Sequence, residues 1–77
     1  MITNHVRLSG TMFEVKNLAL SDHEILQVAT FVYNGGHSHI RLLVLPATKL
    51  SLCNNLACIV VGTLHNDHIN VEALEKL

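Results

Sequence analysis

The chain has 77 residues, of which 49% are hydrophobic and 14% are charged. This length supports a single domain, residues 1–77, and the composition excludes a disordered segment, which would combine low hydrophobicity with high net charge. The net charge of -1 also excludes a general electrostatic attraction to nucleic acid, so any nucleic-acid contact must be local.

The first predicted strand covers residues 5–13. Its side chains alternate between an apolar face and a mixed face that carries Arg7 and Phe13. Gly10 has no side chain to pack, and a glycine inside a strand is typical of a bulge or a sharp bend. Residues 14–24 are polar with a Ser-Asp turn signal, so they predict the end of this strand followed by a loop.

Residues 25–45 predict a β-hairpin. Two runs rich in β-branched residues flank a Gly-Gly pair at 35–36, and adjacent glycines adopt the positive φ angles that a tight reversal requires. Alternation in the first run places Phe31 and Tyr33 on one face. We expect Arg41 of the second run to share that face.

The region after this hairpin predicts a connector and a buried strand. Pro46 ends the preceding strand because it cannot donate a ladder hydrogen bond. Residues 47–55 predict a connector, with one helical turn as an alternative. Residues 56–64 form a nearly continuous apolar run, which is typical of a strand buried on both sides, and Gly62 lies within it as Gly10 lies within the first strand.

The chain ends in a second predicted hairpin. Residues 65–68, His-Asn-Asp-His, predict a tight turn, and residues 69–74 alternate as a fifth strand. Residues 72–77 have helix propensity, so a short helical turn is the alternative there. The sequence thus predicts an all-β protein with little or no helix.

Five short strands with glycine bends, and a brief connector after the third, describe the small five-stranded Greek-key barrel called the OB-fold. The N-x-V-x-L-x-G pattern at residues 4–10 and the pattern V-V-G-x-L at residues 60–64 resemble the bacterial single-stranded-DNA-binding proteins of the OB-fold superfamily. The segment Leu-Ser-Gly-Thr at residues 8–11 is most similar to primosomal replication protein N. The resemblance implies an OB-fold that covers nearly the whole chain.

The resemblance also implies a nucleic-acid site on the face of the second and third strands and in neighbouring loops. Bases stack on aromatic side chains and cations follow the phosphates. Six residues are candidates for these contacts: Arg7, Phe13, Lys16, Phe31, Tyr33 and Arg41. The alternative is that Phe31 and Tyr33 belong to the core or to a dimer interface, and that Arg41 is only a solvated strand residue.

The function that these features predict is binding of single-stranded DNA, or a primosome-type role as a replication accessory with other replication proteins as partners. The alternative is an OB-fold adaptor or assembly module that binds protein and no nucleic acid. The small core predicts a homo-oligomer, with a dimer favoured. No P-loop, G-x-S-x-G or H-E-x-x-H motif is present, so we do not expect an enzyme.

Histidines and cysteines raise the question of a metal. His37 and His39 lie in the first hairpin turn and His65 and His68 in the second, and the OB topology would bring these turns to one end of the barrel. Closed zinc sites usually include cysteine, so polar loop histidines are the favoured interpretation, and we predict no metal and no cofactor.

The remaining sequence features concern the compartment. Cys53 and Cys58 do not form a C-x-x-C motif, and Cys58 lies in an apolar run, so we expect reduced thiols. No apolar run is long enough for a membrane span, and no basic region followed by an apolar block stands at the N-terminus. We therefore expect a cytoplasmic protein without membrane contact.

Overall fold

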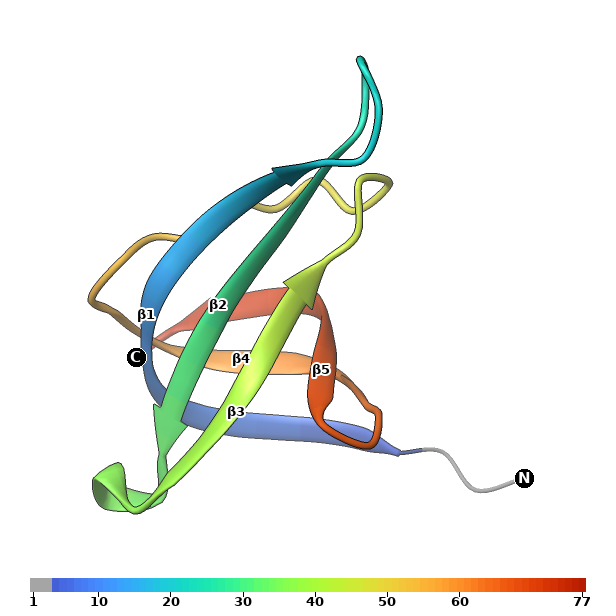
Figure 1. Ribbon diagram of the computed structural model, residues 1–77. Helices are drawn as coiled ribbons and strands as arrows, with labels where there is room; N and C mark the ends of the chain where they lie inside the picture. The colour runs from blue at the N-terminus through green and yellow to red at the C-terminus, as the bar shows by residue number, and fades with distance from the viewer. Residues whose placement is uncertain (1–3) are drawn as a thin grey trace.

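Five strands make up nearly all the regular structure of the computed structural model, which describes residues 4–77 (Figure 1). They close into a barrel in the order β1-β2-β3-β5-β4, in which β3 and β5 are parallel and the other neighbours are antiparallel. The predicted all-β, five-stranded, OB-like barrel is confirmed. The elements are β1 (His5–Ala19), β2 (Ile25–Tyr33), the 3-10 turn η1 (Asn34–Gly36), β3 (Ser38–Val44), β4 (Leu56–Leu64) and β5 (His68–Lys76).

β1 is longer than the sequence predicts. Residues 5–12 pair with β4, whereas residues 10–19 pair with β2, and the register with β2 shifts between Phe13 and Lys16. Glu14 has a φ of 55°, which identifies the irregularity as a backbone bulge. The predicted strand end near residue 13 is therefore wrong. The bulge bends β1 away from β4, and its polar second half continues as a hairpin with β2 that projects from the barrel (Figure 1).

The core lies inside the barrel and is built from alternate residues of each strand. Its fully or nearly fully buried side chains are Met12, Ala29, Phe31, Leu42, Val44, Leu52, Cys58, Val60, Ile69 and Val71. Burial raises the pKa of the Cys58 thiol. Among residues 4–77 no disulfide is present, and Cys53 is exposed.

The connector between β3 and β4 contains turns but no helical turn. It contributes one side chain to the core, that of Leu52. The Leu52 backbone N–H donates to Gln27 Oε1 at 3.0 Å, and Gln27 Nε2 donates to Asn17 Oδ1 at 2.9 Å. These bonds fix the connector to the β1–β2 hairpin.

Two glycines permit close approach between strands. A Cβ atom on Gly10 would collide with the carbonyl oxygen of Val32, and one on Gly62 would collide with that of Asn70. The register between β4 and β5 also shifts between Val61 and Gly62. The bulge predicted for these glycine positions thus occurs at Gly62, whereas the bulge of β1 lies beyond Gly10.

The second predicted hairpin is confirmed, and β5 continues to Lys76 as a strand without a terminal helical turn. The His65 backbone N–H donates to the His68 carbonyl at 2.8 Å and closes the turn. Within the part of the chain that the structure describes, no helix has the length and apolar character needed to cross a membrane.

Candidate nucleic-acid interface

The outer face of β1, β2 and β3 carries the strongest candidate site. Phe13 pairs with Thr30 across β1 and β2, and Thr30 pairs with Arg41 across β2 and β3. Lys16 pairs with Val28 in the next outward-facing row. Because directly paired residues of antiparallel strands project to the same side, these side chains share one face of the barrel.

This face is hollowed. Lys16 and Arg41 line one hollow of about 270 Å³ together with Thr30. Phe13 lines a second hollow of about 570 Å³ with Thr30 and His39. Because Thr30 lines both, the hollows adjoin, and we refer to the surface formed by Phe13, Lys16, Thr30, His39 and Arg41 as the β1–β3 groove.

The two cations of the groove are available to a ligand. Within residues 4–77, neither Lys16 nor Arg41 takes part in an ion pair. Phe13 is 36% exposed, so part of its ring is open to solvent. A groove with an exposed aromatic ring beside two cations that form no ion pair has the side chains that stack on a base and contact phosphates.

The other two aromatic candidates lie elsewhere. Phe31 pairs with Ile40, is fully buried in the barrel, and stacks on Tyr33 with ring centroids 6.2 Å apart. The prediction that Phe31 and Arg41 share a face is therefore wrong, and the alternative assignment of Phe31 to the core is correct. Tyr33 is partly buried and packs against the same core.

The sequence held a signal that would have corrected this assignment. A two-residue turn at 35–36 places residue 34 opposite residue 37, and it therefore places Phe31 opposite Ile40 and Thr30 opposite Arg41. The pairs that the structure shows follow this register. The same count would have identified Thr30 and His39 as members of the site.

Arg7 is not brought to the groove. It lies on the far side of the barrel, where its Nη2 donates to Glu75 Oε1 at 2.6 Å and its Nε donates to Glu75 Oε2 at 3.2 Å, across β4. The hydrogen bond and charge of Arg7 hold the pKa of Glu75 below its usual value. The guanidinium of Arg7 is thus already paired with a carboxylate.

Two carboxylates among residues 4–77 border the groove: Glu14 lines both of its hollows, and Asp67 lines an adjacent one. Asp67, in the β4–β5 turn, lines a hollow of about 320 Å³ with His39 and Arg41. A hydrogen bond from His68 is the main cause of a lowered Asp67 pKa, to which the charge of Arg41 also contributes. Asp67 is therefore ionised near neutral pH and partly offsets the charge of Arg41.

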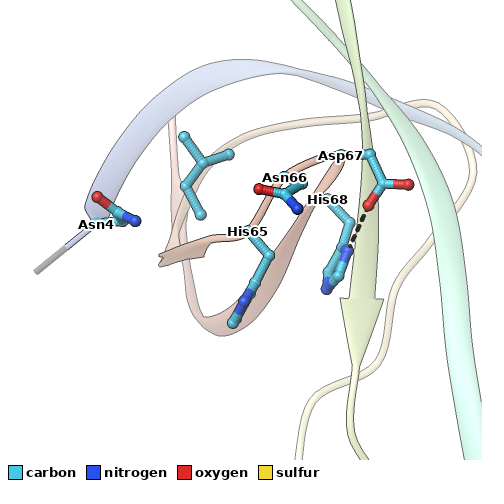
Figure 2. A pocket seen from close by; sticks show the side chains of 6 residues that line it. Asn4, His65, Asn66, Asp67 and His68 are labelled. Atoms are coloured by element: carbon cyan, nitrogen blue, oxygen red, sulfur yellow. Dashed lines mark hydrogen bonds and ion pairs between the residues drawn. The ribbon is translucent and has the colours of Figure 1, made fainter.

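The β4–β5 turn also forms a pocket next to the groove (Figure 2). The His65 and His68 side chains lie side by side in Figure 2. Their rings stack with centroids 4.9 Å apart and planes at 15°. His68 Nδ1 lies 2.9 Å from Asp67 Oδ1, and His65 Nε2 lies 3.1 Å from Asn70 Nδ2. Residues Asn4, Leu64, His65, Asn66, Asp67 and His68 line this pocket of about 570 Å³.

The histidines of the two hairpin turns do not converge. In the described chain, residues 4–77, no three His, Cys, Asp or Glu side chains are grouped so that they could hold a metal ion. His65 and His68 lie face to face with each other, while His39 lies in the β1–β3 groove. The metal alternative therefore has no ligand set among these residues.

Comparisons with known proteins assign no family to this chain, so its classification rests on the barrel architecture. No family model, curated protein or solved structure matches this chain. The observed architecture agrees with the small OB-like barrel that the sequence resemblance implies. Membership of the primosomal protein N group stays a prediction.

Proposed function

We propose that this protein binds single-stranded DNA through the β1–β3 groove. The observation that carries the proposal is that two free cations, Lys16 and Arg41, line one hollow while the exposed ring of Phe13 lines the next. Single-stranded nucleic acid is bound by this combination, in which bases stack on aromatic rings and cations contact the phosphates. The resemblance to OB-fold DNA-binding proteins supports the same function in replication.

The groove sets the strength of binding. Each phosphate neutralised on a single strand contributes about 0.7 to the slope of log affinity against log salt concentration. Lys16 and Arg41 together predict a slope of about −1.4. Binding by one protomer is therefore weak and strongly favoured at low salt.

Fluorescence anisotropy with a labelled oligo-dT tests the proposal. We expect salt-sensitive binding that is weakened by Arg41→Ala and by Lys16→Ala, and a salt slope that falls by about 0.7 for each lost cation. Arg7→Ala is the matched control, because it removes the same type of charge on the far side of the barrel. Absence of binding at low salt with protein on the order of 100 μM would refute the proposal.

Phe13 provides a separate test of base stacking. We expect Phe13→Ala to weaken oligo-dT binding by about 1–3 kcal/mol, the usual cost of removing one aromatic partner of a base. Phe13→Leu keeps an apolar side chain without an aromatic face, so it should lose nearly as much affinity. If Phe13→Leu binds as tightly as the unchanged protein, Phe13 does not stack on a base.

A protein-binding module is the second candidate. It is favoured by four exposed apolar side chains near the end of the β1–β2 hairpin, those of Leu18, Leu20, Ile25 and Leu45. Beyond Met12, β1 has no pairing with β4. The Val15 backbone N–H donates to Asn54 Oδ1, and after Val15 no strand among residues 4–77 pairs with the outer edge of β1. Self-association through this edge and these side chains would give the predicted dimer.

Analytical ultracentrifugation tests this second candidate. We expect a dimer whose dissociation constant rises in the variant Leu18→Asp with Ile25→Asp, because both side chains are about half exposed and available to a second copy. The variant Asp22→Asn, in the loop between them, serves as a control for changes at the hairpin tip. A monomer at all concentrations, with DNA binding intact, would exclude this candidate.

A further inference from the structure

The β4–β5 turn places two histidines at the end of the β1–β3 groove. In the parallel ladder of β3 and β5, His68 is the partner of Arg41. Asp67 lines one hollow with Arg41 and His39 and another with His65 and His68. The pocket of Figure 2 therefore adjoins the groove at Asp67, and a strand that follows Arg41 would next meet the two stacked histidines.

The charge of this region depends on pH. Among residues 4–77, the fixed charges that line the Asp67 hollow and the histidine pocket near neutral pH are those of Arg41 and Asp67, which sum to zero. Histidine is the side chain whose ordinary titration range lies between about pH 5 and pH 8. Protonation of His39, His65 and His68 would change the sum from zero to three positive charges.

Other charged groups near the turn do not cancel this change. Among residues 4–77, Asp67 is the one carboxylate that lines the histidine pocket, and it already bonds His68 Nδ1. On the adjoining strands, His5 of β1 lies 3.4 Å from Glu72 of β5, so these two groups offset each other when His5 is protonated. The remaining lining residues of the pocket are uncharged, namely Asn4, Leu64 and Asn66.

We propose that protonated His65 and His68 hold a backbone phosphate of the bound single strand, so that the affinity for DNA rises as the pH falls. This inference rests on the proposed function of the β1–β3 groove. Asp67 accepts from His68 Nδ1 and orients that ring. Asn70 Nδ2 donates to Nε2 of neutral His65, and when this ring is charged the Asn70 amide must turn so that its oxygen accepts. His68 Nε2 is then left to donate to a phosphate oxygen when the ring is charged.

The stacking of the rings couples protonation to binding. Two imidazolium rings with centroids 4.9 Å apart lie well within a Debye length of about 8 Å and repel each other. A phosphate beside both rings offsets this repulsion, so binding takes up protons. Each proton taken up raises the affinity by up to about tenfold for each unit of pH.

Oligo-dT anisotropy at constant ionic strength, from about pH 7.5 to about pH 5.5, tests the inference. Thymine has no group that titrates in this pH range, so the change in affinity reports on the protein. We expect the affinity to rise about tenfold or more and the salt slope to become steeper by about 0.7 at the lower pH. The variant His65→Gln with His68→Gln should lose most of the rise, whereas His23→Gln in the β1–β2 loop should lose none.

The outcomes separate this inference from the proposed function. Binding that is independent of pH, or a rise that persists in the double variant, overturns the histidine site and leaves the groove in place. Absence of binding at every pH overturns both. Should the double variant be unstable, the ring-proton resonances of the unchanged protein give the same answer: the titration midpoints of His65 and His68 must move to higher pH on binding oligo-dT while that of His23 stays, and an equal response of all three overturns the inference.

Discussion

Replacing Phe31 by alanine distinguishes a core residue from a base-stacking residue. The Phe31 ring is fully buried and stacks on Tyr33. Its edge also lies against Gly10, because Cζ of Phe31 is 3.0 Å from the position that a Cβ of Gly10 would occupy. Removal of the ring would therefore leave a cavity between β1 and β2 that neighbouring side chains fill only in part.

The expected loss follows from this burial. Truncation of a buried phenylalanine to alanine costs about 3–5 kcal/mol. A domain of this length has a free energy of unfolding of roughly 4–12 kcal/mol, from about 0.05–0.15 kcal/mol per residue. Phe31→Ala thus removes a large part of the stability, whereas Phe31→Leu keeps most of the apolar volume and should cost much less.

Urea unfolding followed by circular dichroism measures the change, and oligo-dT binding is measured on the folded fraction. We expect Phe31→Ala to lower the unfolding midpoint strongly and Phe31→Leu to bind oligo-dT with unchanged affinity. The reasoning would be refuted if Phe31→Ala kept its midpoint and lost DNA binding, since that result requires an exposed ring.

Three further predictions concern stability and reactivity. Gly62→Ala should lower stability by about 1–3 kcal/mol, because its Cβ meets a backbone carbonyl of β5; an unchanged urea midpoint would contradict the close approach. In the folded protein a thiol reagent should modify Cys53 rapidly and Cys58 only after unfolding, so rapid reaction of both would contradict the burial of Cys58. The bond to Arg7 holds the pKa of Glu75 below its ordinary value of 4.5. Ionised Glu75 therefore stabilises the fold above pH 4.5, and this stabilisation is lost as the pH falls through the lower pKa of the folded state. Glu75→Gln should therefore flatten the acid dependence of the urea midpoint, and high salt should reduce the difference because the pair is exposed; equal acid profiles at low salt would contradict this contribution.

The strands were largely predictable because their signal is local. Alternation with a period of two and the apolar run at 56–64 predicted β4, and the Gly-Gly turn predicted the β2–β3 hairpin. The second half of β1 was missed, since its exposed polar side chains resemble a loop. It continues the pairing with β2 after a bulge at Glu14, and nothing in the local sequence pattern indicates where such a bulge occurs.

The site was predictable only in part. Sequence reasoning chose Phe13, Lys16 and Arg41, which the barrel brings to one groove. It also chose Phe31, whose direction depends on register, and Arg7, whose carboxylate partner is 68 residues away in the chain. Residue type identifies groups that can stack or carry charge, but it does not indicate which of them are already buried or paired.

By itself, the sequence determined the β class, the number of strands and the positions of the turns, because alternation and turn chemistry act over a few residues. The tertiary structure decided which outward side chains meet. Lys16 and Arg41 belong to strands separated by β2, and Arg41 and His68 become neighbours only through the parallel pairing of β3 with β5. Such contacts depend on the register of several strands and on closure of the barrel, which no local pattern records.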